Sequence, residues 1–146
     1  MFALGCVLED GEPLDSPRAM AQAGPYVAVF FHNLVETSEP GSMESVLGPE
    51  LSAQLEAYRE IYLSYPAAER HLRNHQGHLM YLRDDERFLI TPELIESLSF
   101  TGTASALRQR LDVLDEAGYS QFCIQLVEGE LDAIDDWARL FGLPPA

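Results

Sequence analysis

The sequence predicts an α/β fold that is mostly helical by residue count. Two short apolar runs, residues 2–8 and 121–127, are bounded by turn-forming residues, which is typical of strands buried on both faces of a parallel sheet. Most of the chain between them carries helical periodicity, capping residues and prolines at helix starts. A strand, a set of helices and a second strand predict parallel pairing of the two strands through a right-handed crossover.

The composition fits a single domain, residues 1–146. A chain of 146 residues with 47% apolar residues is long enough to bury a core. No apolar run reaches the roughly 18 residues that a membrane span needs, and residues 1–8 lack the basic start of a secretory signal. Cys6 and Cys123 each lie in an apolar run without CxxC spacing. We therefore expect free thiols and a cytoplasmic protein, with a disulfide as the less favoured alternative.

The charge excludes several classes of function. The chain has 24 acidic and 9 basic residues, all nine of them arginine, and a net charge of −15. Such a charge repels phosphate backbones and anionic lipids, so we expect neither a nucleic acid nor a membrane as partner. The absence of lysine excludes Schiff-base chemistry and the lysine of a phosphate-binding GxxxxGK[ST] loop.

Helix start and stop signals divide the segment between the two strands. Ser16-Pro17 predicts a helix start, and Gly24-Pro25 predicts either a kink or a stop and restart. The other expected elements are a helix from Gly48-Pro49 to Pro66, a short helix over 67–72, a charged turn over 83–87, a helix from Thr91-Pro92, a helix from Gly102-Thr103 to Gly118 and a last helix over 131–141.

Three segments, taken in order, carry a family resemblance. They are residues 22–36, which run from Gln-Ala-Gly-Pro-Tyr to His-Asn-Leu-Val-Glu; residues 65–79, which end in His-Gln-Gly-His-Leu; and residues 98–127, with a Gly-Thr helix start, an arginine-rich helix and Ala-Gly before the last strand. Together they resemble the luciferase-like family of flavin- and deazaflavin-dependent oxidoreductases, in the branch often named methylenetetrahydromethanopterin-reductase-like.

The resemblance implies part of a TIM (β/α)8 barrel. It covers nearly all of this chain but half or less of a family member, and it makes residues 2–8 and 121–127 the last two parallel strands. Residues 16–100 would be a large helical insertion over the mouth of the barrel. The family's reaction is hydride transfer through FMN or a deazaflavin coenzyme. Because two strands cannot close a barrel, we expect weak or no activity from this chain alone, and a homo-oligomer or a partner chain that supplies the remaining strands. The substrate, and the choice between flavin and deazaflavin, stay open.

The candidate cofactor-binding residues are Glu9, Gln125 and Glu128. In a (β/α) barrel, ligands bind at the carboxyl ends of the strands, where these three residues are expected to lie. Gln125 is polar within an apolar strand, and a buried amide needs a hydrogen-bond partner. A flavin ring could be that partner, but a hydrogen bond to a neighbouring backbone group is the favoured interpretation.

The candidate catalytic residues are His75 and His78, which lie in the predicted insertion near a substrate and could donate or accept a proton. The competing interpretation makes them surface or capping residues. His71, His75 and His78 also have the spacing of metal ligands, but no cysteine or carboxylate follows closely, so we expect no metal.

Two further interpretations are structural. His32 and Glu36 are four residues apart and are expected to form a surface pair on one helix. Tyr58 belongs to an aromatic stripe that is expected to pack in the core. One rival to the enzyme as a whole is a non-catalytic module that self-associates through its open strand edges. A second and less favoured rival is a histidine-based metal-binding module.

Overall fold

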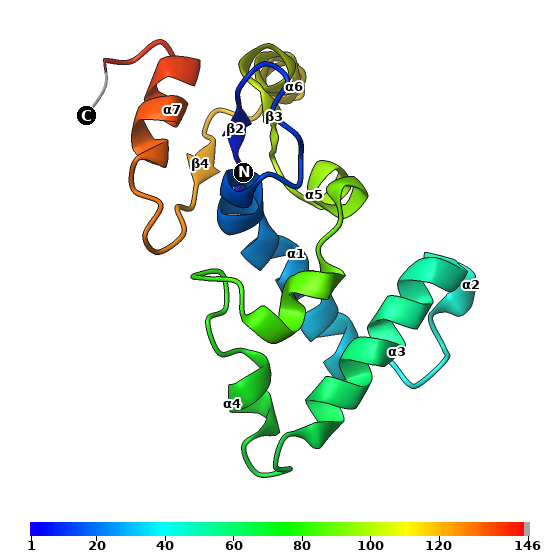
Figure 1. The fold of residues 1–146 in the computed structure, drawn as a ribbon. Helices are drawn as coiled ribbons and strands as arrows, with labels where there is room; N and C mark the ends of the chain where they lie inside the picture. Colours follow the sequence, from blue (N-terminus) through cyan, green and yellow to red (C-terminus); the bar gives the residue numbers. More distant parts are fainter. Residues whose placement is uncertain (145–146) are drawn as a thin grey trace.

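The computed structural model describes residues 1–144, and its fold is α/β and mostly helical, as predicted. Short extended segments gather at one end of the molecule, where helices α6 and α7 flank them (Figure 1). The long helix α1, Pro17–Thr37, runs from these segments to the helices at the other end. The fold therefore has a strand-containing end and a helical end, connected by one helix.

The strands are short and pair in parallel. Strand β1, Phe2–Ala3, pairs with β4, Cys123–Ile124, and β2, Val7–Leu8, pairs with β3, Gly102–Thr103. The predicted parallel pairing of the first and last extended segments is confirmed. The regular strands are shorter than the apolar runs that predict them. Within the described residues, the strands form two two-stranded parallel sheets, and the predicted partial barrel is not confirmed.

A third extended segment, residues 99–103, lies beside the first one. The backbone N–H of Phe100 donates to the carbonyl of Leu4 at 2.8 Å, and that of Gly102 donates to Cys6 at 3.1 Å. Residues 1–8 thus lie between residues 99–103 and 121–125. The sequence predicts only a helix start at Gly102-Thr103, which is confirmed as well, because the Thr103 hydroxyl caps α6.

Helix α1 is continuous through Pro25, so the predicted alternative of a stop and restart is wrong. Ser16 caps the helix as expected, with its hydroxyl accepting from the N–H of Ala19. A proline removes one helical hydrogen bond. The buried face continues on both sides of it, from Ala23 to Val27, and packs against the neighbouring helices. Tertiary packing therefore outweighs the local signal.

The remaining helices follow the predicted starts at Gly48-Pro49 and Thr91-Pro92. They are α2 (Glu44–Leu47), α3 (Pro49–Ser64), α4 (Arg70–Asn74), the 3-10 helix η1 (Asp84–Leu89), α5 (Pro92–Leu98), α6 (Ala104–Glu116) and α7 (Ala133–Leu140). Three differ from the prediction: α2 is not predicted, α4 spans Arg70–Asn74 instead of 67–72, and the charged turn expected over 83–87 forms η1.

Each end of the molecule has its own apolar core. The larger core packs α1, α3, η1 and α5 together around Phe31, Leu55 and Ile95. The smaller one packs the extended segments against α6 and α7 around Leu107 and Trp137. No described helix has the length and apolar character needed to cross a membrane.

The two cysteines are free thiols, as expected. Cys6, in the extended segment of residues 1–8, is fully buried against Ala19 of α1, and Cys123 is partly buried. Desolvation by burial raises the pKa of the Cys6 thiol to about 12.

The close approach of residues 1–8 to residues 99–103 requires a glycine at position 5. A Cβ atom there would overlap with the backbone carbonyl of Phe100, which cannot move away as a flexible side chain can. We expect Gly5→Ala to lower the free energy of unfolding by about 2–3 kcal/mol, as overpacking of a core does. The measurement is urea unfolding followed by circular dichroism.

Gly102→Ala is the matched control, because it lies on the facing segment and its added Cβ would make only ordinary contacts of 3.6–3.8 Å. Equal urea midpoints for the two variants would contradict the assigned pairing.

Candidate functional site

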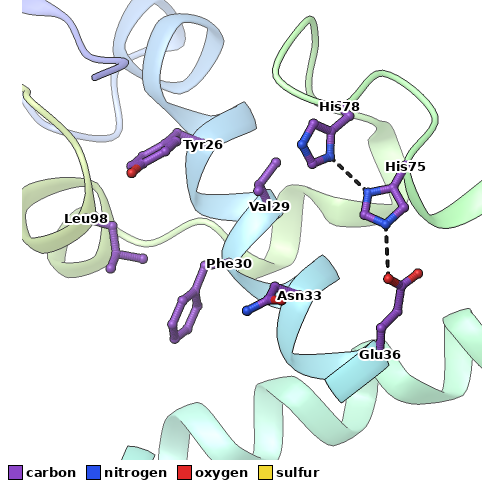
Figure 2. A pocket seen from close by; sticks show the side chains of 8 residues that line it. All are labelled: Tyr26, Val29, Phe30, Asn33, Glu36, His75, His78 and Leu98. Carbon is purple, nitrogen blue, oxygen red and sulfur yellow. Dashed lines mark hydrogen bonds and ion pairs between the residues drawn. The ribbon is translucent and has the colours of Figure 1, made fainter. Parts of the chain in front are cut away.

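A pocket of about 440 Å³ opens between α1, α5 and the turn that follows α4 (Figure 2). Its wall is largely apolar, and its polar lining residues are Asn33, Glu36, His75 and His78. The complete lining is Tyr26, Val29, Phe30, Asn33, Glu36, His75, His78 and Leu98. Such a volume with few polar groups is typical of small-molecule sites.

Both candidate catalytic residues lie at this pocket, in contact with each other. His75 Nδ1 is 3.0 Å from His78 Nδ1, and His75 Nε2 is 3.1 Å from a carboxylate oxygen of Glu36 (Figure 2). The turn that carries the two histidines contains Gly77 at φ 77° and Leu79 at φ 59°. A leucine in the left-handed region is uncommon and needs support from its surroundings.

His32 lies behind these two rings and is 2% exposed. The expectation that His32 and Glu36 form a surface pair is wrong. His32 Nε2 pairs with the carboxylate of Glu86 in η1, and Glu36 binds His75 and Asn74 instead. The helical spacing of residues 32 and 36 does not reveal this arrangement, because both partners come from distant segments.

Glu86 is the centre of the buried polar network. Its carboxylate accepts from the Tyr58 hydroxyl at 3.2 Å and pairs with the guanidinium of Arg83 at 2.7 Å, in addition to His32. The Tyr58 hydroxyl is also 2.8 Å from Asn74 Oδ1, so Tyr58 lies in the core as expected but as part of this network. These contacts join α1, α3, α4 and η1 around the site.

The ionisation of the site follows from burial and neighbouring charges. Burial works to raise the pKa of the Glu36 carboxyl, but hydrogen bonds from Asn74 and His75 hold the pKa below its ordinary value. Burial, and next the ring of His75, lower the pKa of His78. Near neutral pH the site therefore presents an ionised Glu36 and a neutral His78, whose imidazole can accept a proton or bind a cation.

The candidate cofactor residue Gln125 makes the backbone hydrogen bond that the sequence favours. Its side-chain Nε2 donates to the carbonyl of Leu79 at 3.2 Å. The N–H of Glu128 donates to the carbonyl of Met80 at 3.0 Å. These two bonds attach the turn that carries His78 to the carboxyl end of β4, so Gln125 supports the site without lining the pocket.

The other two candidate cofactor residues lie elsewhere. Glu9 is exposed and lines a cavity of about 170 Å³ beside α7, and the exposed side chain of Glu128 lines one of about 310 Å³ beside the start of α1. Both follow strands, as predicted. The structure does not bring them together with His75 and His78.

His71 is exposed and lies outside the group that sequence spacing assembles. The spacing requires the helix to continue from residue 71 to residue 75, but α4 ends at Asn74. The histidine that joins His75 and His78 is His32, from α1.

Sequence reasoning missed three members of the site: Asn74, Glu86 and the hydroxyl of Tyr58. The sequence carries only a weak signal for Glu86. Its segment forms part of an apolar core, and a carboxylate that becomes buried there needs charged or hydrogen-bonding partners. No pattern along the chain identifies those partners.

Chemically, the site combines an apolar cavity, two imidazoles that can hold or pass a proton, and an anionic carboxylate behind one of them. The described residues that line the cavity include no arginine, so they fit an apolar ring better than a phosphate group.

Comparison with protein-family models, with curated proteins and with solved structures finds no match to this chain. The resemblance to the luciferase-like family therefore depends on the three sequence segments alone and stays a prediction.

We expect Glu86→Gln to lower the free energy of unfolding by about 2–3 kcal/mol, because it leaves the largely buried guanidinium of Arg83, whose side chain is 11% exposed, without its principal charged partner. Urea unfolding measures the change. The control is Asp84→Asn, two residues away, whose side chain is 97% exposed in its ion pair with Arg87. We expect it to cost less than about 0.5 kcal/mol, and an equal loss in both variants would contradict the role given to Glu86.

Proposed function

We propose that this chain is the closing part of a luciferase-like (β/α) barrel, and that it takes part in hydride transfer through a flavin or deazaflavin ring when further strands complete the barrel. The observation that carries the proposal is the parallel pairing of Phe2–Ala3 with Cys123–Ile124, the two segments that the resemblance makes strands seven and eight. The free thiols fit a cytoplasmic protein.

The edges of the extended segments support the need for further strands. The N–H groups of Cys123 and Gln125 face the first segment, and within the described residues no strand pairs with the other edge of β4. An unpaired edge of this kind is a template for another strand.

The pocket supports the binding of the ring rather than of its phosphate. Tyr26, Phe30 and Leu98 provide an apolar wall for a planar ring. When bound, a flavin or deazaflavin would supply the hydride chemistry. This chain would exclude water through the apolar wall, and His75 and His78 would hold or move a proton at the rim. The phosphate would bind to the residues that complete the barrel.

A second function is favoured by the unequal edges. Residues 99–103 pair with residues 1–8 on the side where the sixth strand of a closed barrel would pair. Arg110 donates to the carbonyls of Ser99 and Thr101 and so covers the outer edge of residues 99–103. Within the described residues, the outer edge of β4 remains open. One covered edge and one open edge fit a two-fold symmetric dimer, and hence a non-catalytic module that self-associates.

The test combines ring binding with the mass of the purified chain. FMN and a deazaflavin are titrated into the chain while absorbance and fluorescence anisotropy of the ring are followed, and light scattering gives the mass. We expect ring binding in the micromolar range that accompanies an assembly larger than one chain. A colourless dimer that leaves both rings unbound would favour the self-associating module. A monomer that binds neither ring would contradict that module and also the completion of the barrel by further copies of this chain.

A pair of tyrosine variants locates the ring. We expect Tyr26→Ala to weaken ring binding about tenfold, as the loss of an aromatic contact of roughly 1.4 kcal/mol would. Tyr119→Ala removes an exposed tyrosine after α6, away from the pocket, and should leave the dissociation constant unchanged. Equal dissociation constants for the two variants would contradict ring binding in this pocket.

A further inference from the structure

Three imidazoles from two distant segments lie in contact at the polar side of the pocket. His32 comes from α1, and His75 and His78 come from the turn after α4. One ring nitrogen of each residue lies within 4.8 Å of the other two. The ring centroids are 4.9–5.8 Å apart. Every pair among the three rings is therefore in contact.

His32 has one ring nitrogen available for a ligand. Its Nε2 is held by Glu86, and its buried Nδ1 has no hydrogen-bond partner in the structure. A buried polar atom that lacks a partner costs about 1–3 kcal/mol. Since a carboxylate can only accept, Nε2 carries a proton, and in the neutral ring Nδ1 is the nitrogen with the lone pair.

A carboxylate stands behind two of the three rings. Glu86 binds Nε2 of His32, and Glu36 binds Nε2 of His75 at 3.1 Å. Metal-binding histidines commonly donate their second N–H to a carboxylate, which fixes the ring and raises the basicity of the ligating nitrogen. Both histidines are thus arranged to bind through Nδ1. The two carboxylates also balance the charge of a dication.

The geometry points to a site for a transition-metal dication of the Zn²⁺ type, held by His32, His75 and His78. Neutral imidazoles suit Zn²⁺, Cu²⁺, Fe²⁺ and Ni²⁺. Bonds of about 2.0–2.1 Å in tetrahedral geometry place ligating nitrogens about 3.3 Å apart. The Nδ1 atoms of His75 and His78 are already 3.0 Å apart. A shift of the exposed turn by up to about 1.5 Å would bring the third nitrogen from within 4.8 Å to this spacing.

Three protein ligands leave one position for a further ligand. Because His75 and His78 line the 440 Å³ pocket, a ligand in the pocket would reach this position, and the pocket's apolar wall includes Tyr26, Phe30 and Leu98. Three histidines with an open fourth position are typical of catalytic zinc sites. The pocket would take a small molecule with an oxygen ligand for the metal and an apolar body.

This metal site does not depend on the proposed barrel function. With a metal bound, His75 and His78 are ligands rather than proton carriers.

The test is the binding of Zn²⁺ and Co²⁺ to the purified full chain after treatment with a chelator. Competition with a chromophoric chelator gives the stoichiometry and dissociation constant for Zn²⁺, and the visible bands of Co²⁺ report the coordination number. We expect one ion per chain, submicromolar affinity for Zn²⁺, and a Co²⁺ spectrum of four or five coordination. No flavin is present, so the outcome is independent of ring binding.

Four variants distinguish metal binding at the three histidines from non-specific attraction of cations to the acidic surface. His75→Ala and His78→Ala should weaken Zn²⁺ binding more than about 100-fold, and Glu36→Gln about 10–100-fold. The matched control is His71→Ala, which removes an exposed histidine four residues from His75 and should bind as the unchanged protein does. Circular dichroism checks that each variant is folded.

Two outcomes would overturn the metal site. One is the absence of submicromolar binding in the unchanged protein. The other is binding that is the same in His75→Ala and His71→Ala, which would be attraction of cations to a chain of net charge −15.

Discussion

The buried carboxylate of Glu86 is the constraint on which the helical end depends. A charge with 1% exposed surface is tolerated only when its oxygens are paired. Its partners are His32 from α1, Tyr58 from α3 and Arg83 from the residue before η1. Satisfying one carboxylate therefore fixes three segments relative to one another, and it selects which ring nitrogen of His32 keeps a lone pair.

The turn that carries His75 and His78 is held from two sides. Arg83 donates to the carbonyls of Asn74 and Gln76, so the cation that pairs with Glu86 also orders the turn. From the other side, Gln125 donates to Leu79, next to the second histidine. Since Gln125 follows β4, the site at the helical end is attached directly to the strand-containing end.

The same groups allow two kinds of chemistry. As free imidazoles beside an apolar wall, His75 and His78 can exchange protons with a bound ring or substrate. As metal ligands, they lose that capacity and instead present an open coordination position to the same wall. The residue that distinguishes the two kinds of chemistry is His32. Its buried Nδ1 has no hydrogen-bond partner among the described residues, and its ring contacts those of His75 and His78.

The amino-acid pattern alone predicts the local features of this protein. It determined the helix starts at Ser16-Pro17, Gly48-Pro49 and Thr91-Pro92, because capping and proline geometry act within a few residues. It also indicated the two apolar extended segments and their parallel pairing, because a strand that is buried on both faces has a continuous run of apolar residues. Contacts between distant segments are the reason that α1 continues through Pro25, that residues 99–103 lie beside residues 1–8, and that His32 rather than His71 contacts His75 and His78. Those outcomes depend on packing and on hydrogen bonds between segments up to about a hundred residues apart. Patterns of residues along the chain do not predict such long-range contacts.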